Sequence, residues 1–261
     1  MLKKKQLTIV KLGSYILSNP IVLMESLALF SKLPGDKILV HGGGAEATEI
    51  GDKLGIESTM VEGRRVTDAK SLELVLMVYA GLINTQIVAK LQGLDCNAIG
   101  LSGADGNCIQ ATKRVNGTVD FGFVGDVSNI NTGTINSLLK AGMYPVFCAI
   151  SHDASGTLLN TNGDTIAAEL AIAFSEEYES SLFYCFDKLG VLMDVNDANS
   201  IIPVLSKNKY QELMENSLIH SGMLPKLKNG YSALEGGVKT VNLGQISMLG
   251  SNNENCTKLL L

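Results

Sequence analysis

Short runs of β-branched and other apolar residues alternate along the chain with longer segments whose apolar positions recur at helical spacing. Residues 7–12 have the pattern of a buried strand, and residues 20–33 carry apolar side chains three and four positions apart before a Pro-Gly-Asp turn signal. A second strand is expected at 37–41 and a second helix at about 45–54. Strands separated by helices in this rhythm predict crossover units and a mostly parallel sheet.

The same alternation continues to the end of the chain. Residues 69–92 predict one long helix. The Gly- and Asn-rich stretch 105–130, with short alternating runs at 108–111 and 119–123, predicts antiparallel hairpins on the edge of the sheet. Further strands are expected at 98–101, 144–149, 181–186, 240–243 and 258–260, and further helices at about 131–141, 164–174, 207–216 and 223–235.

The order of these elements predicts the fold class. We expect an α/β chain, a three-layer αβα sandwich around a mostly parallel central sheet. The 261 residues, 46% of them hydrophobic, are enough to bury a large core. A change of lobe is expected near residue 175, which gives an N-terminal lobe of residues 1–175 and a C-terminal lobe of residues 176–261.

The charge balance and the cysteine pattern exclude several classes of protein. The 21 Lys and Arg residues against 26 Asp and Glu residues give a net charge of −5, which offers no basic surface for nucleic acid. We expect no membrane span, since no apolar run reaches the roughly 20 residues that cross a bilayer. Five cysteines without a Cys-x-x-Cys pair and no secretory signal indicate reduced thiols and a cytoplasmic protein, and the three histidines lack the spacing of a metal site.

Two glycine turns at the ends of predicted strands are the first candidates for chemistry. One is Lys11-Leu12-Gly13-Ser14, and the other is His41-Gly42-Gly43-Gly44, which opens a helix. Glycine lets backbone N–H groups approach an anion, and a helix N-terminus adds about half a positive charge. Two such turns at the carboxyl ends of neighbouring strands predict an anion cradle, with tight structural turns as the alternative. Neither is a Walker A or Gly-x-Gly-x-x-Gly sequence.

A hydrolase is a second interpretation of the triple glycine. His-Gly-Gly-Gly supplies oxyanion-hole donors in some esterases. Gly100-Leu101-Ser102-Gly103-Ala104 is close to a nucleophile elbow, and an aspartate and His220 follow in triad order. An elbow must lead into a helix, however, whereas Ser102 is followed by Asp105-Gly106-Asn107 and a strand-like run. The sequence therefore disfavours this interpretation.

Five motifs in order resemble the amino acid kinase family. They are Lys11-Leu12-Gly13, Val40-His41-Gly42-Gly43-Gly44, Gly63-Arg64-Arg65-Val66-Thr67-Asp68, Asn160-Thr161-Asn162-Gly163-Asp164 and Gly222-Met223-Leu224-Pro225-Lys226. The similarity extends over essentially the whole chain. The Arg-Val-Thr-Asp element narrows the resemblance to members that use ATP to phosphorylate the side-chain carboxylate of N-acetyl-L-glutamate in arginine biosynthesis. The resemblance implies this reaction, with N-succinylglutamate or a related amino-acid carboxylate as the alternative acceptor.

The resemblance also implies roles for individual residues. Lys11 and Lys226 would stabilise the transferring phosphoryl group, and Asp164 would hold both lysines in position. Arg65 and Asn160 would bind the carboxylate and the amide of the acceptor. The remaining contacts are Gly43 and Gly44 to the acceptor, and Gly13, Ser14, Asp187, Gly190, Leu192 and Gly222 to the nucleotide. The N-terminal lobe would bind the acyl amino acid and form the dimer, and the C-terminal lobe would bind the nucleotide.

The chemistry of phosphoryl transfer agrees with these residue types. A side-chain carboxylate with a pKa of about 4.3 is already a nucleophile at neutral pH, so no general base is needed. Positive charge is needed between carboxylate and triphosphate, and two lysines with Mg²⁺ bridging the phosphates of ATP would supply it. An arginine fork suits a planar carboxylate better than lysine does.

Several assignments have structural alternatives. Lys226 by itself also fits a solvated helix position, and Asp164 precedes a helix that its carboxylate could cap. Arg64 stands beside Arg65, and only the motif selects the second arginine. A regulator that binds ligands on the same fold without catalysis is a functional alternative.

We expect a homodimer. The apolar stripe of the long helix at 69–92 suits the core or a dimer interface. Family members that arginine inhibits carry an extra N-terminal helix that links dimers into hexamers, whereas this chain starts almost directly at its first strand. The resemblance therefore implies a dimer without arginine feedback.

Overall fold

The computed structural model describes residues 4–61, 64–115, 119–194, 196–197, 200–216, 218–219, 222–250 and 255–261. The chain forms two units, Met1–Lys37 together with Ala167–Leu261, and Ile38–Ile166. The chain thus leaves the first unit after Lys37 and returns to it at Ala167, near the lobe change expected at residue 175. The functional division into residues 1–175 and 176–261 stays a prediction.

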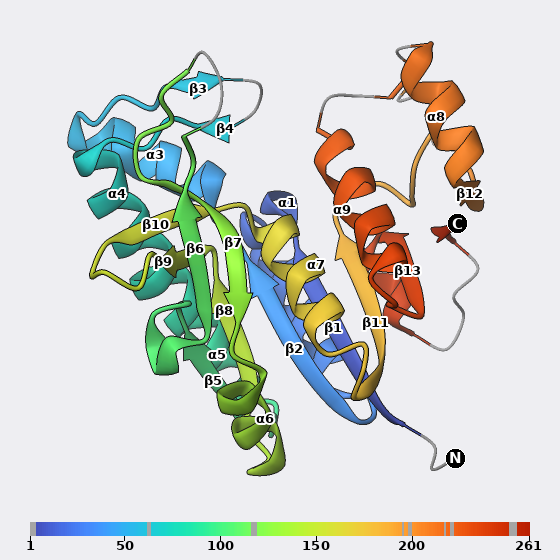
Figure 1. Ribbon diagram of the computed structural model, residues 1–261, viewed down its shortest axis with the longest axis horizontal. Coiled ribbons are helices and arrows are strands. Elements are labelled where there is room, and N and C mark those ends of the chain that lie inside the picture. Colours follow the sequence, from blue (N-terminus) through green and yellow to red (C-terminus); the bar gives the residue numbers. More distant parts are fainter. Residues whose placement is uncertain are drawn as a thin grey trace. The chain divides into compact units, whose positions relative to one another are not determined.

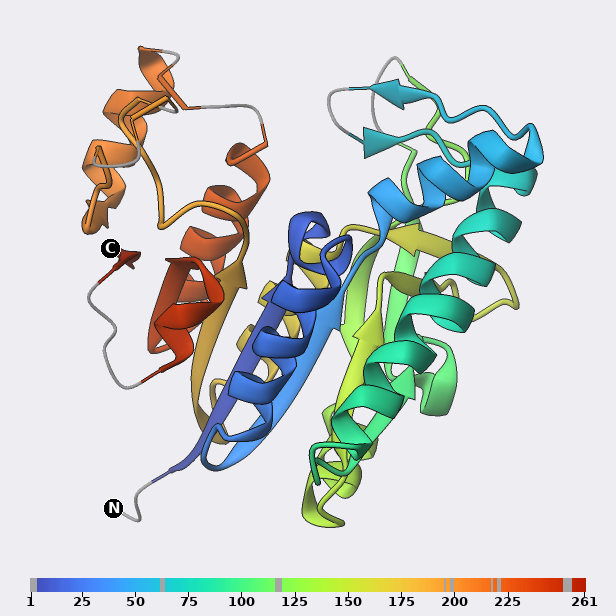
Figure 2. The same ribbon diagram turned by 180° about the vertical axis from the view of Figure 1, so that it is seen from behind.

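The first unit is built on a sheet whose described strands follow the order β12-β14-β13-β11-β1. Neighbouring strands are parallel, except that β13 and β14 are antiparallel. Helix α2 lies on one face of these strands, and α7 and α9 lie on the other (Figures 1 and 2). The elements are β1 (Lys5–Leu12), α1 (Ser14–Leu17), α2 (Pro20–Ser31), α7 (Gly163–Ala173), β11 (Tyr178–Cys185), β12 (Val204–Ser206), α8 (Lys207–Glu215), α9 (Leu224–Glu235), β13 (Thr240–Gly244), the 3-10 helix η3 (Ile246–Leu249) and β14 (Cys256–Leu260). Helix α7 spans the boundary, because its residues up to Ile166 belong to the second unit.

Local sequence explains how the first unit begins. Strand β1 buries Ile9 and Val10 completely. Helix α2 starts at Pro20, whose fixed φ suits the first helical position, and the side chain of Asn19 accepts N–H bonds from the first turn. The helix then buries Phe30 against the core. A capped, proline-initiated helix therefore follows the strand.

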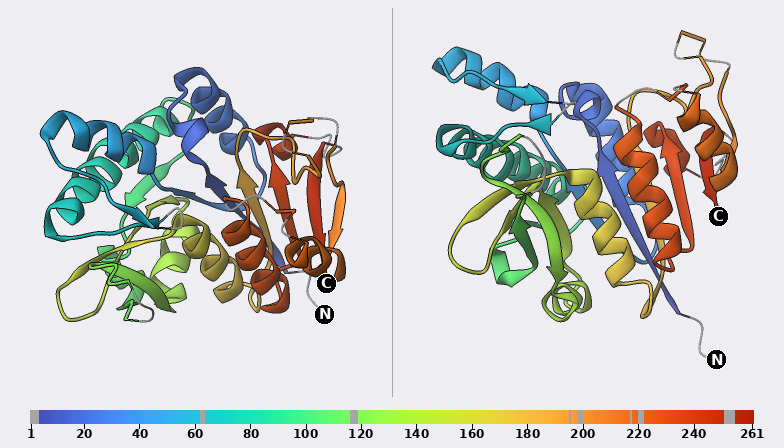
Figure 3. Two further views of the ribbon diagram at one scale, coloured as in Figure 1. Left: turned by 90° about the horizontal axis from the view of Figure 1, so that it is seen from above. Right: turned by 45° about the horizontal axis from the view of Figure 1, so that its top comes forward.

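The second unit combines three parallel strands in the order β2-β8-β5 with a closed barrel of β10-β7-β6-β9 and a small β3-β4 hairpin, as far as the described residues show. Helix α3 packs against α4 and η1 (Figure 3). The elements are β2 (Asp36–His41), α3 (Gly44–Leu54), β3 (Met60–Val61), β4 (Arg64–Arg65), α4 (Ala69–Val75), the π-helix η1 (Leu76–Ile83), α5 (Asn84–Gln92), β5 (Ala98–Leu101), the 3-10 helix η2 (Asp105–Asn107), β6 (Ile109–Lys113), β7 (Val124–Ile130), α6 (Thr132–Lys140), β8 (Tyr144–Cys148), β9 (Ile150–His152) and β10 (Leu158–Thr161).

The expected α/β class with mostly parallel strands is confirmed, but the prediction for 105–130 is partly wrong. The run at 108–111 does lead into β6, but its antiparallel partner is β7 and not the run at 119–123. Gly122 has a φ of 69° and forms a parallel β-bridge with Thr67, whose carbonyl oxygen accepts the N–H of Phe123 at 2.6 Å. Both strands belong to the barrel rather than to the edge of the parallel sheet, and β9 and β10 were not predicted.

The long helix expected at 69–92 is confirmed as α4, η1 and α5 in direct succession. By length and hydropathy alone it is a candidate to cross a membrane, with a mean hydropathy of 1.6 over 18 residues, of which 39% are buried. The helix is nevertheless a core element of the second unit, because Val75, Ile87 and Leu91 are fully buried and α5 packs on β5 and β8.

Candidate active site

The loop between β2 and α3 places backbone N–H groups at the start of a helix. Gly43 is the N-cap residue of α3 and has a φ of 146°, a conformation that residues with a side chain rarely adopt. A Cβ atom at this position would overlap Ile83 and lie 2.9 Å from Cδ1 of Tyr79. Position 43 therefore requires glycine for its conformation and for its packing on η1. The helix N-terminus that begins at Gly44 suits an anion.

Arg65 ties this loop to the β3-β4 hairpin. Its guanidinium donates to the carbonyl oxygen of Gly44 at 2.9 Å, to the hydroxyl of Thr48 at 2.7 Å and to the hydroxyl of Ser58. Only 6% of Arg65 is exposed, and its Nε–H has no hydrogen-bond partner among the described residues. The neighbouring Arg64 is exposed. The fold therefore buries the second arginine of the pair and leaves its Nε–H unpaired among the described residues.

The hydroxyl of Tyr79 lies next to this guanidinium. Burial raises the pKa of Tyr79, and the nearby positive charge and hydrogen bond of Arg65 oppose that rise. Tyr79 also packs against Gly43. The π-helix η1 therefore supports the glycine loop and the arginine at the same point.

Asn160 is linked to Arg65 through Thr67. Nδ2 of Asn160 donates to Oγ1 of Thr67 at 3.0 Å, and the Thr67 hydroxyl donates to the carbonyl oxygen of Arg65 at 3.2 Å. Thr67 is completely buried, whereas Asn160 is partly exposed. The structure thus brings together the two residues expected to bind the acceptor. Thr67 is the link between them, and nothing in its motif distinguished it from its neighbours.

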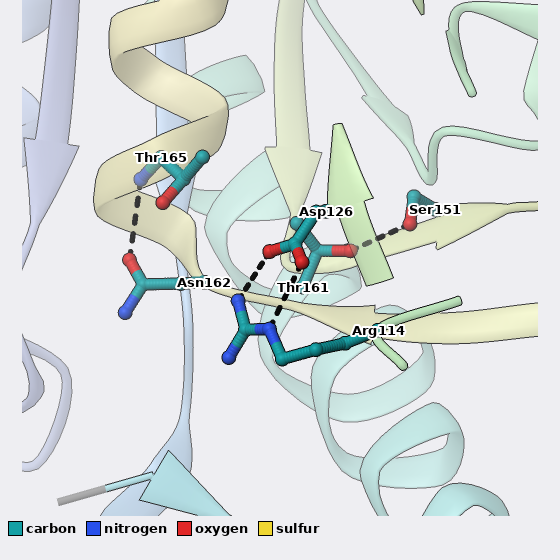
Figure 4. Close-up of polar contacts among 6 residues, drawn as sticks. All are labelled: Arg114, Asp126, Ser151, Thr161, Asn162 and Thr165. Carbon is teal, nitrogen blue, oxygen red and sulfur yellow. Dashed lines mark hydrogen bonds and ion pairs between the residues drawn. The ribbon is translucent and has the colours of Figure 1, made fainter. Parts of the chain in front are cut away.

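Asn162 and Asp164 have different places at the start of α7. Oδ1 of Asn162 accepts the N–H of Asp164 at 2.8 Å and that of Thr165 at 3.2 Å, the second of which Figure 4 shows. Asn162 therefore caps the helix, and the alternative that Asp164 does so is wrong. Asp164 lies within the first turn and is 4% exposed. The helix dipole favours a carboxylate there.

Two polar contacts join the strands of the barrel that carries Asn160 (Figure 4). Arg114, at the end of β6, forms a bidentate ion pair with Asp126 on β7, with Nε and Oδ2 2.9 Å apart. This hydrogen-bonded pairing raises the pKa of Arg114. The hydroxyl oxygens of Ser151 and Thr161 are 2.6 Å apart and connect β9 to β10. These contacts fix the strand from which Asn160 projects.

In the first unit, β1 and β11 are parallel neighbours, so their carboxyl ends meet. Lys11 is partly buried near the end of β1, and its charge opposes the rise in the pKa of the Cys185 thiol that burial causes. The N–H of Gly13 donates to the carbonyl oxygen of Cys185 at 2.8 Å, and Ser14 begins α1. The structure therefore brings the first glycine turn next to the segment 186–192, which contains three of the residues expected to contact the nucleotide, Asp187, Gly190 and Leu192.

The first half of that segment is anchored at the end of β13. The N–H of Phe186 donates to the carbonyl oxygen of Gly244 at 2.9 Å, and Nε2 of Gln245 donates to the carbonyl oxygen of Asp187 at 2.9 Å. The Asp187 carboxylate lies 3.5 Å from the Lys188 ammonium, and both side chains are exposed. The backbone of Asp187 is therefore held, while its side chain faces solvent.

Thr257 on β14 holds the second half of the segment. Its hydroxyl accepts the N–H of Val191 at 2.8 Å and donates to the carbonyl oxygen of Ile202 at 2.7 Å. Gly190 lies against it, because a Cβ atom there would be 2.9 Å from the Thr257 nitrogen. Leu192 follows in a short β-bridge. Nothing in the sequence marks Thr257, since a threonine within a strand is common.

Lys226 lies in the first turn of α9 and is partly buried. Leu227 and Tyr231 on the same helix are buried in the core of the first unit. Gly222 stands two residues before the helix begins, and His220, the histidine of the hydrolase interpretation, lies outside the described residues. Lys11 and Lys226 thus belong to the same unit, on different elements.

The structure agrees with rejecting the hydrolase. Strand β5 ends at Leu101, and only the short 3-10 helix η2 follows before β6. The N–H and the hydroxyl of Ser102 both donate to the Asp105 carboxylate, at 2.6 and 2.7 Å. Ser102 therefore closes a tight turn rather than occupying a strand-to-helix elbow.

Comparison with known proteins shows which family the chain belongs to. Residues 6–243 match the model of the amino acid kinase family. The chain belongs to the amino acid kinase family. Two similar members are the acetylglutamate kinase of Phocaeicola vulgatus, 49% identical over 91% of this chain and 93% of that protein, and the acetylglutamate kinase of Cytophaga hutchinsonii, 47% identical over 97% of each.

Solved structures support the fold of this amino acid kinase family member. N-acetylglutamate synthase from Neisseria gonorrhoeae, in a complex with coenzyme A and N-acetyl-glutamate, matches with a TM-score of 0.80 and 22% identity. The match covers 100% of this chain and 60% of the synthase. At this identity the likeness establishes the fold alone.

Proposed function

We propose that this chain is an acetylglutamate kinase. It transfers the terminal phosphoryl group of ATP to the side-chain carboxylate of N-acetyl-L-glutamate and forms N-acetyl-L-glutamyl 5-phosphate, a step of arginine biosynthesis. The observation that carries the proposal is the identity of 49% and 47% to two acetylglutamate kinases over more than nine-tenths of the chain. A relationship this extensive covers both units and all five motifs.

In this proposal, Arg65, Asn160 and the loop at Gly43 and Gly44 bind the acceptor. The buried Nε–H of Arg65 is a charged donor suited to a carboxylate. Asn160 supplies an amide side chain, and the start of α3 supplies backbone N–H groups. Support comes from the hydrogen bonds that join Arg65 to Gly44 directly and to Asn160 through Thr67.

Lys11 and Lys226 stabilise the transferring phosphoryl group, and Asp164 keeps their ammonium groups in place. Phosphoryl transfer is dominated by positioning and by neutralisation of charge. The acceptor carboxylate is itself the nucleophile, so the chain needs no base to remove a proton. The residues proposed to hold the nucleotide are Gly13, Ser14, Asp187, Gly190, Leu192 and Gly222.

Mg²⁺ accompanies the nucleotide in this proposal. The described residues contain no group of three or more His, Cys, Asp or Glu side chains that could hold a metal ion. Mg²⁺ bound to a nucleotide is held mainly by phosphate oxygens and water, so it does not need a cage of protein side chains. When bound, Mg²⁺ offsets negative charge on the phosphates.

We also propose that the chain acts in the cytoplasm as a homodimer. Met77 and Leu82 on η1 are 56% and 44% exposed, and an apolar surface of this kind suits a second copy. Sedimentation tests the oligomer. We expect a dimer, and a monomer at micromolar concentration would contradict it.

A hydroxylamine-trapping assay with MgATP tests the activity. The acyl phosphate should form with N-acetyl-L-glutamate in preference to N-succinyl-L-glutamate, glutamate, aspartate and aminoadipate. Lys11→Ala and Lys226→Ala should each lower kcat by ~10²-fold or more, because each removes a charge that the transition state needs. Ser102→Ala is the control and should retain activity. Nucleotide binding without release of ADP would replace the proposal with a non-catalytic regulator.

A further inference from the structure

His41 is a fully buried histidine bonded to the glycine loop. It is the last residue of β2, and its Nδ1 lies 2.9 Å from the carbonyl oxygen of Gly42. Its Nε2 lies 2.9 Å from Nδ2 of Asn84, the first residue of α5. Both ring nitrogens are therefore engaged within the second unit. The reaction proposed above assigns His41 no part.

The surroundings of Asn84 determine which ring nitrogen carries the proton. Nδ2 of Asn84 also donates to the carbonyl oxygen of Val146 at 2.8 Å. A carbonyl can only accept, so the amide of Asn84 must direct its NH₂ group toward Val146 and His41. Nε2 of His41 is then the acceptor, and Nδ1 carries the proton and donates it to Gly42. A second proton, on Nε2, would place an N–H donor opposite the NH₂ donor of Asn84, so the ring of His41 is neutral.

Gly100 on β5 makes room for this arrangement. A Cβ atom at position 100 would overlap Oδ1 of Asn84, which is itself only 5% exposed. Asn84 directly follows the π-helix η1, which packs on Gly43. One continuous helix therefore holds the loop at two points, by packing at Gly43 and through His41 at Gly42. Local π-helical turns often occur at functional sites.

The bond from His41 also determines where the next N–H group points. In a trans peptide the carbonyl of one residue and the N–H of the following residue point in opposite directions. The described chain has no cis peptide bond. The Gly42 carbonyl points toward the imidazole, so the N–H of Gly43 points away from it. Rotation of this peptide would reverse that N–H group.

We propose that His41, held neutral with its proton on Nδ1 by Asn84, is a positioning residue that orients the backbone N–H groups of loop 42–44 toward the anionic substrate. The kinetic consequence rests on the proposed acetylglutamate kinase activity. The tautomer and the orientation of the loop rest only on the hydrogen bonds and on the packing of Gly43 and Gly100.

Two substitutions at position 41 distinguish a role of His41 in positioning the loop from a role in stability alone. In His41→Asn, the side-chain NH₂ occupies the place of Nδ1 and keeps the bond to Gly42. In His41→Gln, the side-chain oxygen occupies the place of Nε2 and keeps the bond from Asn84. Each variant leaves one buried polar group without its partner, so similar losses in thermal stability are expected. His41→Gln should lose kcat/KM by roughly 10²-fold because the loop is misplaced, while His41→Asn should stay within about tenfold of the natural protein.

Nitrogen-15 NMR of the natural protein, with His41 identified through His41→Asn, tests the tautomer without any assay. We expect Nδ1 to be protonated and Nε2 unprotonated at neutral pH. Protonation at Nε2, a charged ring, or equal losses of kcat/KM in the two variants would overturn the proposal. If the natural protein does not phosphorylate N-acetyl-L-glutamate, the proposed function fails. The NMR result then still decides the tautomer of His41.

Discussion

Nη2 of Arg65 donates a hydrogen bond of 2.9 Å to the carbonyl oxygen of Gly44, the first residue of α3. This bond joins a two-residue strand to the glycine loop, although the two residues are 21 positions apart. The same guanidinium group also bonds to Thr48 one turn further along α3. Arg65 therefore positions the loop in addition to its proposed contact with the substrate carboxylate.

The substitution Arg65→Lys should weaken acceptor binding although it keeps the positive charge. A single ammonium group cannot replace a planar fork that reaches Gly44, Thr48 and Ser58 together. We expect KM for N-acetyl-L-glutamate to rise ~10- to 100-fold, since hydrogen bonds to charged groups contribute about 1.5–3 kcal/mol. Steady-state kinetics measures the change. Arg64→Lys, at the exposed neighbour, is the matched control, and equal effects in both variants would contradict the assignment.

Gly43→Ala should destabilise the second unit, whereas Gly42→Ala should be tolerated by the fold. At position 43 the φ of 146° is unfavourable for alanine, and the added methyl group would meet Ile83 and Tyr79. At position 42 nothing lies within 4 Å of an added Cβ atom. We expect Gly43→Ala to lower the free energy of unfolding by about 1–3 kcal/mol. Urea denaturation of both variants measures the free energy of unfolding. An equal loss in Gly42→Ala and Gly43→Ala would contradict the prediction.

Thr257→Val should raise KM for ATP. Valine matches the shape of threonine but leaves the Val191 N–H and the Ile202 carbonyl without their shared partner. Each unsatisfied group costs about 1–3 kcal/mol, and the segment at Asp187 and Gly190 should lose its fixed conformation. Thr257→Ser keeps the hydroxyl and should restore nucleotide binding. Isothermal titration with an ATP analogue compares the two, and identical affinities would refute the role of the hydroxyl.

Asn162→Ala should affect both stability and turnover. Loss of an N-cap costs about 0.5–2 kcal/mol, and here it also releases the turn that carries Asp164. Asn131→Ala is the matched control, since the Asn131 side chain caps α6 by accepting the N–H of Thr134 at 3.1 Å. Both variants should lower the melting temperature, but only Asn162→Ala should lower kcat. A normal kcat in Asn162→Ala would show that Asp164 does not depend on this cap.

The cysteine thiols should resist modification in the folded protein. All five cysteines are buried, and burial raises the pKa of Cys108 to about 11 and that of Cys148 to about 12. Thiols in the unfolded chain ionise near pH 8.5, so they lose a proton there that the folded chain keeps. The free energy of unfolding should therefore fall as the pH rises from about 8.5 toward 12.

Labelling with iodoacetamide at pH 8, with and without urea, measures how strongly the folded protein protects its thiols. Fast labelling in the native state would contradict the predicted protection. Cys148→Ala should reduce the fall in the free energy of unfolding between pH 8 and pH 10. An unchanged pH dependence would count against the role of Cys148.

The sequence alone predicted what depends on residues close together along the chain. The strand and helix pattern was confirmed for β1, β2, α3, α5 and β5 because each element's apolar periodicity and turn signals are local. The motif around Arg65 is likewise a contiguous run of residues, so the sequence shows it directly. Local motifs also carried the resemblance that led to the family.

Only the tertiary structure decided which distant residues support the site. Thr257 bonds to Val191 across 66 positions, Asn160 to Thr67 across 93, and His41 to Asn84 across 43. The barrel built from β6, β7, β9 and β10 depends in the same way on pairing between separate segments. A buried polar group forms a hydrogen bond with a residue that the fold places beside it. When that residue is far away along the chain, the local sequence pattern does not identify it.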